Sequence, residues 1–256
     1  MGFLIAREKM NSLLKSIEII ETISQHQPIG VGELSKLLNM PKSSVQRVLM
    51  TFQEAGWLRQ AGTEMTRWEI GARVVGVRPN ALKGGALQKA ARQSMQDLCE
   101  LVNETVHLSI PDGTTAMVLI EETECRQVVR TAYSIGSVSP FHATANGLAV
   151  LAHMNDGQID EVLGRELPKY SENTITDPVL IRAELARIRE RGYSVNLGQY
   201  RHQIYAIGSP VFDSNGVVVA SVCFSMPGSR FDPDRIDEWG RAVRSAANEI
   251  SGGGIN

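Results

Sequence analysis

The spacing of apolar residues predicts three helices in the first part of the chain. Apolar positions recur three or four residues apart over residues 12–26, 31–38 and 41–56. Pro28 separates the first two helices, and Pro41 stands in the first turn of the third, where its missing N–H costs nothing. The positions expected to face the core are Leu13, Ile17, Ile20 and Ile23 in the first helix, Val31, Leu34, Leu37 and Leu38 in the second, and Val45, Val48, Leu49 and Phe52 in the third.

Two short strand patterns follow the third helix. Residues 57–60 and 66–71 flank a break at residues 61–65, which predicts a hairpin. Three helices and a hairpin in this order are typical of a winged helix-turn-helix. We therefore predict a winged helix-turn-helix domain over residues 1–71.

The rest of the chain predicts a linker and a second domain. Glycine and proline without a coherent apolar period indicate a linker over residues 72–85, partly helical. Residues 86–256 carry strands and helices in separate runs, which predicts an α+β domain with helices on the faces of an antiparallel sheet. The expected helices cover residues 86–104, 144–153, 156–164, 177–192 and 232–250, and the expected strands cover residues 105–110, 115–122, 127–133, 193–197, 203–212 and 217–226. We expect Asp177 to cap the helix over residues 177–192 and Gly192 to end it, and the last helix to begin with a similar Asp-Pro pair.

Composition is that of a globular protein. The chain has 256 residues, 43% of them hydrophobic, and a formal net charge of -2, so a nucleic-acid interface has to come from local arrangement. It contains no run of 18 apolar residues, and its first segment lacks the apolar length of a secretion signal, so we expect a cytoplasmic protein without a membrane partner. Cys99, Cys125 and Cys223 are widely spaced, and we expect small buried side chains there rather than disulfides or zinc ligands.

Several motifs in a shared order resemble the IclR family of bacterial transcription regulators. The resemblance covers nearly the whole chain, from about residue 12 to residue 250. It implies an N-terminal winged helix that binds DNA, a linker helix that pairs protomers, and a C-terminal GAF-like domain that binds a small effector, in dimers that commonly pair into tetramers. The motifs are SLLKSIEIIE, VGELSKLLNMPKSSVQRVLMTFQEAGWL, ETVHLS, PFHATANGLAVLA, TITDPVLIRAELARIRERGYSV and SPVFDSNGVVVASV.

The third helix is the candidate DNA reader, because a recognition helix presents its first turns to base edges. Arg can read guanine and Gln can read adenine, so Gln46 and Arg47 are the candidates for base contact. The positive end of the helix suits phosphate at Lys42, Ser43 and Ser44. The alternative of a merely solvated amphipathic helix stays open for any one side chain. One further helix position and two candidates for backbone or minor-groove contact in the wing complete the set: Thr51, Arg59 and Arg67.

The charge of the first domain favours an assembly of protomers. Residues 1–72 contain eight Lys or Arg and seven Asp or Glu, so a single copy has little net attraction for phosphate. A second copy doubles the phosphate contacts. We expect double-stranded operator DNA to be bound by a homodimer or homotetramer.

The candidate effector site lies at the start of the helix predicted over residues 144–153. Thr144 begins this helix, and the free amides that follow favour an anion, for which a carboxylate is a common cellular candidate. His142 either touches the effector or packs beside the helix start. By resemblance, the pocket is completed by the amides of Ala145 and Asn146, by the side chains of Asn196, Ala206, Cys223 and Ser225, and by Ile204 on its apolar wall.

This pocket departs from the pattern that the resemblance implies. The family frequently has an acidic residue at Asn196, Cys at Ala206, Ser at Cys223 and a Gly-Lys pair at residues 147–148. A less polar and roomier pocket favours a small-molecule effector that is an organic acid of larger, partly apolar and aromatic character. The alternative that the polar positions are structural hydrogen-bonding groups stays open for Asn146, Asn196 and Ser225.

The competing interpretation is an enzyme or a small-molecule-binding module on the α+β domain, with the winged helix serving protein contacts. Against the enzyme, the sequence shows no nucleophile, base and orienting group in a recognisable motif. The histidines have no metal-ligand spacing. We therefore predict no catalytic residue, no metal site and no cofactor.

Overall fold

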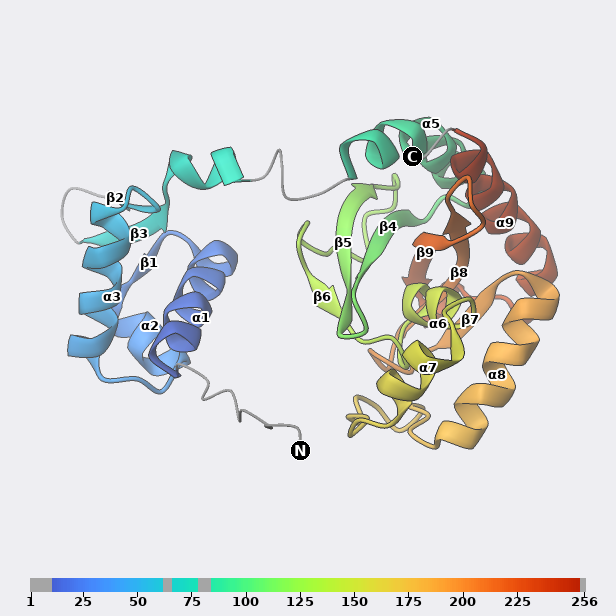
Figure 1. Ribbon diagram of the computed structural model, residues 1–256. Helices are drawn as coiled ribbons and strands as arrows, with labels where there is room; N and C mark the ends of the chain where they lie inside the picture. The colour runs from blue at the N-terminus through green and yellow to red at the C-terminus, as the bar shows by residue number, and fades with distance from the viewer. Residues whose placement is uncertain (1–10, 62–65, 78–83, 254–256) are drawn as a thin grey trace. The chain divides into compact units, whose positions relative to one another are not determined.

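The computed structural model describes residues 11–61, 66–77 and 84–253 (Figure 1). The chain divides into two compact units, residues 1–82 and residues 83–256. Each unit is described by itself. Within the residues predicted as a linker, a 3-10 helix spans Ala72–Val77. Residues 78–83 of that linker lie outside the described residues, and its last two residues begin the helix Gly84–Val102.

The first unit contains the three predicted helices and the predicted hairpin. A two-residue strand that the apolar pattern did not indicate joins the hairpin in an antiparallel sheet of order β1-β3-β2. The turn expected at residues 61–65 lies mostly outside the described residues. The elements are α1 (Asn11–His26), β1 (Ile29–Gly30), α2 (Val31–Leu37), α3 (Lys42–Glu54), β2 (Leu58–Ala61) and β3 (Arg67–Ile70).

The core of this unit confirms most, but not all, of the predicted apolar faces. Leu34, Val45 and Leu49 are 0% exposed and pack with Trp68 of β3, which is 1% exposed. Partly buried positions, among them Val48 and Phe52, pack against this core. The remaining core members are Ile19, Ile23, Ile29 and Leu58.

Three predicted core positions are wrong. Leu13 is 55% exposed, Ile17 45% and Leu37 56%. In α1 the buried positions are Ile19 and Ile23, toward its C-terminal end. A side chain is buried only where another element lies opposite it, and α2, α3 and β3 cover only the C-terminal part of α1. The helical spacing of apolar residues alone therefore did not predict which of them are buried.

The second unit is built on a six-stranded sheet of order β6-β5-β4-β9-β8-β7, with every neighbouring pair antiparallel. This arrangement confirms the α+β class. The strands are β4 (Thr105–Asp112), β5 (Ala116–Thr123), β6 (Val138–Ser139), β7 (Ser194–Leu197), β8 (Ile204–Phe212) and β9 (Val218–Pro227). The helices are α5 (Gly84–Val102), α6 (Ala145–Leu151), α7 (Asp156–Leu163), α8 (Pro178–Arg191) and α9 (Ile236–Gly252).

Helices cover both faces of this sheet (Figure 1). On one face α9 packs on β8 and α5 packs on β4 and α9, with the rings of Phe224 and Trp239 6.1 Å apart. On the other face the backbone of α6 approaches β8 so closely that a Cβ on Gly208 would lie 3.2 Å from the carbonyl of Ala145. We call this second side the α6 face. All seven residues of α6 are buried.

Helix ends in this unit follow the predicted chemistry. The Asp177 carboxylate accepts the amide of Val179 at the start of α8, and Gly192 ends the helix with φ 82°. At the last helix the Asp-Pro pair starts a 3-10 turn, and the α-helix begins one turn later than expected. Asp232 caps a 3-10 turn over Pro233–Arg235, and α9 itself begins at Ile236.

The strand predicted at residues 127–133 is wrong. This segment is irregular, and the edge strand β6 instead forms at Val138–Ser139 against β5. Val128 is 95% exposed and Val129 is 67% exposed, so the β-forming residues there have no sheet face to cover. The predicted turn after β4 is also shifted, because Pro111 and Asp112 still pair with β5.

Membrane-spanning helices and cysteine pairing both bear on function. Among the described residues, no helix combines the length and apolarity needed to cross a membrane. Cys99, Cys125 and Cys223 are free and buried, which confirms their predicted role as small buried side chains.

Candidate DNA-binding and effector-binding sites

The first turns of α3 present polar side chains to solvent. Lys42, Ser43, Gln46 and Arg47 are exposed, and Ser44 is half-buried. The first turn of α3 has no acidic residue, so the positive end of the helix dipole is not neutralised there. Within the part of the chain that the structure describes, none of these side chains has a hydrogen bond or ion pair to another residue. The surface is therefore free to meet an external polar partner.

The remaining predicted DNA contacts are engaged within the protein to different degrees. The Thr51 hydroxyl donates to the carbonyl of Arg47 at 2.9 Å. Arg59 pairs with Glu69 at 2.6 Å, yet its side chain is 69% exposed. A surface pair of this kind is worth little and can exchange for a phosphate.

Arg67 instead ties β3 to the start of α2. It donates to the Pro28 carbonyl at 2.8 Å and pairs with Glu33 at 3.4 Å. The Gly30 amide, together with the Arg67 guanidinium, lowers the pKa of the Glu33 carboxyl below its ordinary value. Arg67 thus has a structural partner inside the N-terminal unit.

The predicted anion site at the start of α6 is partly engaged by protein groups. The helix has seven residues, and the Thr144 side chain accepts the Gly147 amide at 3.0 Å. Ser194 donates to the Ala145 carbonyl at 2.7 Å. These contacts hold α6 against the sheet and engage the Gly147 amide, one of the N–H groups of its first turn.

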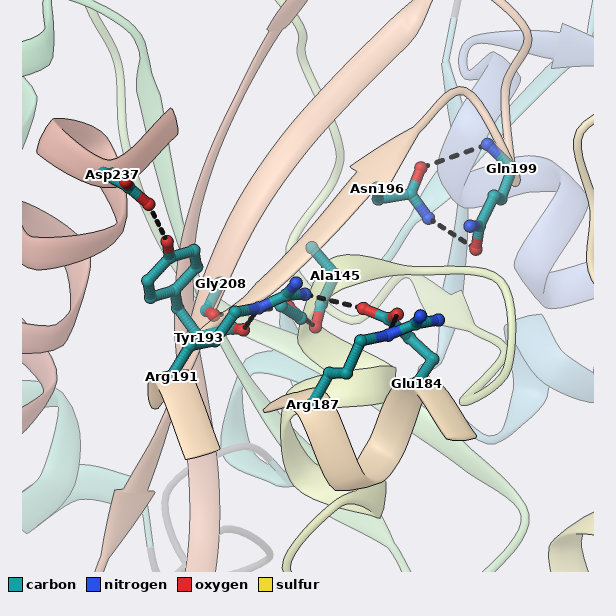
Figure 2. A network of polar contacts seen from close by, with 10 residues as sticks. Ala145, Glu184, Arg187, Arg191, Tyr193, Asn196, Gln199, Gly208 and Asp237 are labelled. Atoms are coloured by element: carbon teal, nitrogen blue, oxygen red, sulfur yellow. Dashed lines mark hydrogen bonds and ion pairs between the residues drawn. The ribbon is translucent and has the colours of Figure 1, made fainter. Parts of the chain in front are cut away.

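Asn196 joins β7 to two neighbouring segments through its side-chain amide. Its Nδ2 donates to the Ala143 carbonyl at 2.7 Å, and its Oδ1 accepts the Gln199 amide at 3.1 Å. Figure 2 shows Asn196 facing Gln199 across the turn that follows β7. In the same view Tyr193 reaches Asp237, so β7 is fixed to α9 as well. Both polar atoms of the Asn196 amide are used inside the protein, which favours the structural alternative for this residue.

The strand register brings four of the predicted effector residues to the α6 face. Ala206 of β8 pairs with Ser225 of β9, and Cys223 pairs with His107 of β4. Ile204 lies two residues before Ala206 and therefore projects to the same face. Burial raises the pKa of the Cys223 thiol to about 12, so this thiol is protonated and unreactive at neutral pH.

Asn146 and His142 lie at the ends of this face. Asn146 Nδ2 donates to Ser109 at 3.0 Å, while its buried Oδ1 has no partner within the described residues. His142 is 3% exposed and its Nε2 donates to the Pro168 carbonyl at 3.0 Å. Burial lowers the pKa of His142 below its ordinary value, which keeps the imidazole neutral.

A buried polar chain crosses the α6 face. The His107 Nε2 lies 2.9 Å from Ser225 Oγ, which lies 2.6 Å from Thr131 Oγ1. The other imidazole nitrogen, Nδ1, lies 3.1 Å from a carboxylate oxygen of Glu122, although the two are not aligned for a hydrogen bond. Sequence reasoning expected no nucleophile, base and acid in one place, yet the fold brings Ser225, His107 and Glu122 together.

An aromatic row borders the same face. Tyr133 packs edge-on against His107, with ring centroids 5.4 Å apart. The Arg201 guanidinium lies 5.0 Å from the Tyr133 ring and 6.0 Å from the Tyr200 ring. Tyr200 packs against Tyr170 at 4.9 Å, and Tyr170 against His142 at 5.8 Å. We call Tyr133, Arg201, Tyr200, Tyr170 and His142 the aromatic row.

Comparisons with known proteins identify the family. The pattern described as IclR helix-turn-helix domain matches residues 12–62, and the one described as Bacterial transcriptional regulator IclR C-terminal matches residues 80–252. The chain belongs to the IclR family of bacterial transcriptional regulators.

Relatives and solved structures in the IclR family match across almost the full length. The chain is 29% identical over 249 residues to the transcriptional repressor IclR of Escherichia coli K12, covering 96% of this chain and 90% of that one. The IclR crystal structure from Thermotoga maritima has a TM-score of 0.74 at 29% identity, covering 95% and 98%. An IclR homologue from Microbacterium hydrocarbonoxydans, complexed with 4-hydroxybenzoate, shares the fold with a TM-score of 0.77 at 23% identity, covering 94% and 98%.

Part of this candidate site was not indicated by the sequence. His107, Thr131 and Glu122 lie on β4, in an irregular loop and on β5, and only the sheet pairing joins them to Ser225. The aromatic row comes from loops before α6, before α8 and after β7. The one available signal was composition, because three of the five tyrosines of the chain are in this row.

Proposed function

We propose that this IclR-family regulator binds double-stranded operator DNA through the first turns of α3. The proposal is carried by the exposed and unpaired surface of Lys42, Ser43, Gln46 and Arg47 on a helix whose opposite side is locked in the core. Helix-turn-helix proteins place such a surface in the major groove. We further propose that the protein works in the cytoplasm.

The proposed contacts divide by chemistry. Gln46 and Arg47 read base edges, because each can make two hydrogen bonds to a purine. Lys42, Ser43 and Ser44 contact phosphate near the positive helix end. Two exposed positions, Thr51 and Arg59, contact the DNA backbone at the edges of the interface; Arg67 is set aside, because it is committed to Pro28 and Glu33.

The protein acts on DNA as a homodimer or homotetramer. The near balance of charges in residues 1–72 leaves one winged helix with few net phosphate contacts, and pairing doubles them. A helix-turn-helix dimer places two recognition helices on half-sites about one turn of DNA apart.

The second unit binds a small organic acid of aromatic character. The support is the aromatic row beside the α6 face, together with small side chains at Ala206 and Gly208 on that face. The 4-hydroxybenzoate complex of the Microbacterium homologue is an example of such a ligand on this fold. Binding changes operator affinity only if the DNA-competent and incompetent arrangements bind the acid differently, and residues 72–85 have to carry that difference between the units.

A hydrolytic enzyme is the second candidate, because Ser225, His107 and Glu122 are ordered like a nucleophile, base and acid. The geometry favours a structural role. Ser225 is 4% and His107 3% exposed, and Ser225 Oγ is already held by Thr131. A nucleophile needs substrate access and an oxyanion site, and this serine is enclosed.

Footprinting tests the regulator. The purified full-length protein is incubated with the DNA beside its own gene, at several salt concentrations, with and without benzoate, 4-hydroxybenzoate, pyruvate and glyoxylate. We expect salt-sensitive protection that an aromatic acid alters. Absence of protection at every salt concentration would contradict the DNA-binding proposal. A response to pyruvate or glyoxylate alone would contradict the aromatic effector, and turnover of p-nitrophenyl acetate that Ser225→Ala abolishes would favour the enzyme.

A further inference from the structure

Arg201 is a cation held by aromatic rings instead of by a carboxylate. Its guanidinium carbon lies 5.0 Å from the Tyr133 centroid and 6.0 Å from the Tyr200 centroid. Among the described residues, Arg201 has no ion pair, whereas arginines elsewhere in the second unit, such as Arg130 and Arg230, pair with glutamates at 2.6 Å. Its charge is therefore available to an anion from outside the chain.

The two rings fix where that charge lies. Cation–π attraction keeps a guanidinium close to a tyrosine face without using its N–H donors. Tyr133 in turn packs on His107, and Tyr200 packs on Tyr170. Arg201 is thus placed between the half of the aromatic row that rests on the sheet and the half that rests on the loop before α8.

The turn that carries Arg201 is tied to neighbouring loops. Ser171 donates to the Gly198 carbonyl at 2.7 Å, and Thr174 donates to the Gln199 carbonyl at 2.6 Å. Asn196 accepts the Gln199 amide from the other side. These bonds preorganise the turn, so binding a ligand there costs less ordering of the backbone.

The buried side of Tyr133 already faces a carboxylate of the protein. The Glu122 carboxylate accepts the Tyr133 amide at 3.3 Å and lies 3.1 Å from His107 Nδ1. Burial is the main cause that raises the pKa of the Tyr133 phenol, with Arg201 acting in the opposite direction. A ligand carboxylate would accordingly be drawn to the Arg201 end of the row and away from Glu122.

The competing anchor, the N-terminus of α6, offers backbone amides without a formal charge. The helix has only seven residues, and Thr144 already accepts the Gly147 amide. The carbonyls of Ala143 and Ala145, which flank the helix start, accept hydrogen bonds from Asn196 and Ser194. No full positive charge is present there, whereas Arg201 supplies one with a planar set of donors that matches a carboxylate.

We propose that Arg201 is the specificity-determining residue of the effector site: it binds the carboxylate of an aromatic acid whose ring lies against Tyr133 and Tyr200. This inference rests on the proposed effector-binding function. The ring supplies apolar and stacking contact that a neutral analogue shares, and the guanidinium supplies the preference for the acid.

Calorimetry on the full-length protein separates these contributions. Benzoate and 4-hydroxybenzoate are compared with the neutral benzamide on the wild type, Arg201→Met and Arg201→Lys. The control is Arg241→Met, which removes an exposed arginine on α9, on the opposite face of the sheet. We expect Arg201→Met to weaken the acids about 10- to 100-fold, since hydrogen bonds to a charged group are lost, and to leave benzamide nearly unchanged. Arg201→Lys should recover part of the lost affinity for the acids. Arg241→Met should bind the acids as tightly as the wild type does.

The outcomes distinguish this inference from the proposal on which it rests. If the acids bind the wild type and Arg201→Met equally well, Arg201 is not the anchor, while the aromatic effector stands. If Arg201→Met weakens the binding of benzamide as strongly as that of benzoate, Arg201 contributes to the shape of the site but not to recognition of the carboxylate. That result overturns the inference. If no aromatic acid binds the wild type, the effector class and the inference both fail, while footprinting still decides DNA binding.

Discussion

The side-chain amide of Asn196 donates a hydrogen bond of 2.7 Å to the carbonyl oxygen of Ala143, which joins β7 to the segment that leads into α6. The same side chain accepts the Gln199 amide at 3.1 Å. Asn196 is 3% exposed, so both bonds are shielded from water. A side-chain amide fits this position, because it can donate to a carbonyl and accept from an N–H.

Replacing Asn196 by Asp should therefore destabilise the second unit. A carboxylate keeps the acceptor for Gln199 but places negative charge against the Ala143 carbonyl, at a cost of about 1–3 kcal/mol in the free energy of unfolding. Chemical denaturation followed by circular dichroism measures the change. Asn248→Asp, at an exposed position of α9, is the matched control and should change stability little. If Asn196→Asp and the control variant are equally stable, the two hydrogen bonds of the Asn196 side chain contribute nothing to stability.

Arg47→Ala should weaken operator binding. Loss of one bidentate base contact costs about 1–3 kcal/mol, or roughly 5- to 150-fold in Kd, and relaxes preference at one base position. Quantitative footprinting on operator variants checks both effects, with calorimetry to show that effector affinity is retained. Lys15→Ala, at an exposed position of α1, serves as the control for loss of one positive charge. Unchanged operator affinity in Arg47→Ala would exclude this residue as a reader.

Leu49→Ala should unfold or loosen the first unit. Leu49 is 0% exposed, and truncating a buried leucine to alanine costs about 2–5 kcal/mol through lost burial and a cavity. The neighbouring Met50→Ala is the control, because Met50 is 47% exposed. Calorimetric scans should show a lower transition for the first unit in Leu49→Ala only. A shift of equal size in both variants would contradict the assignment of the buried face of α3.

Acid should destabilise the folded protein in part through His142. Burial lowers the pKa of His142 in the folded state below the ordinary value of 6.5, so the unfolded chain binds the proton more readily. The contribution of this group is present above pH 6.5 and is lost as the pH falls below it. Unfolding temperatures at pH 7.5 and pH 5.5 should differ less in His142→Gln than in the wild type. His202→Gln, at an exposed position, is the control, and an identical pH response in His142→Gln would refute the prediction.

Local signals in the sequence predicted much of the fold. The Asp177 cap and the Gly192 stop of α8 depend on residues within one turn of the helix ends, and the structure has both. The core face of α3 followed from the spacing of Val45 and Leu49. The same reasoning was wrong for Leu13 and for residues 127–133, because burial there depends on whether another element lies opposite.

Contacts in the candidate effector site could not be predicted from local sequence patterns. Asn196 was a candidate for ligand contact or for a structural role, and its amide donates to the Ala143 carbonyl and accepts from the Gln199 amide. Arg201 and Tyr133 were not singled out, since 68 positions separate them in the sequence and neither belongs to a regular pattern. A turn and an irregular loop meet there only after the sheet has formed.

The sequence by itself determined the helices, both ends of α8 and the buried face of α3, because periodicity and capping act within a few residues of the chain. Only the tertiary structure decided which polar groups share the α6 face. His107 and Ser225 are 118 positions apart and meet because β4 pairs with β9 in one register. Strand register sets such contacts, and it depends on the packing of the whole sheet, which no local pattern encodes.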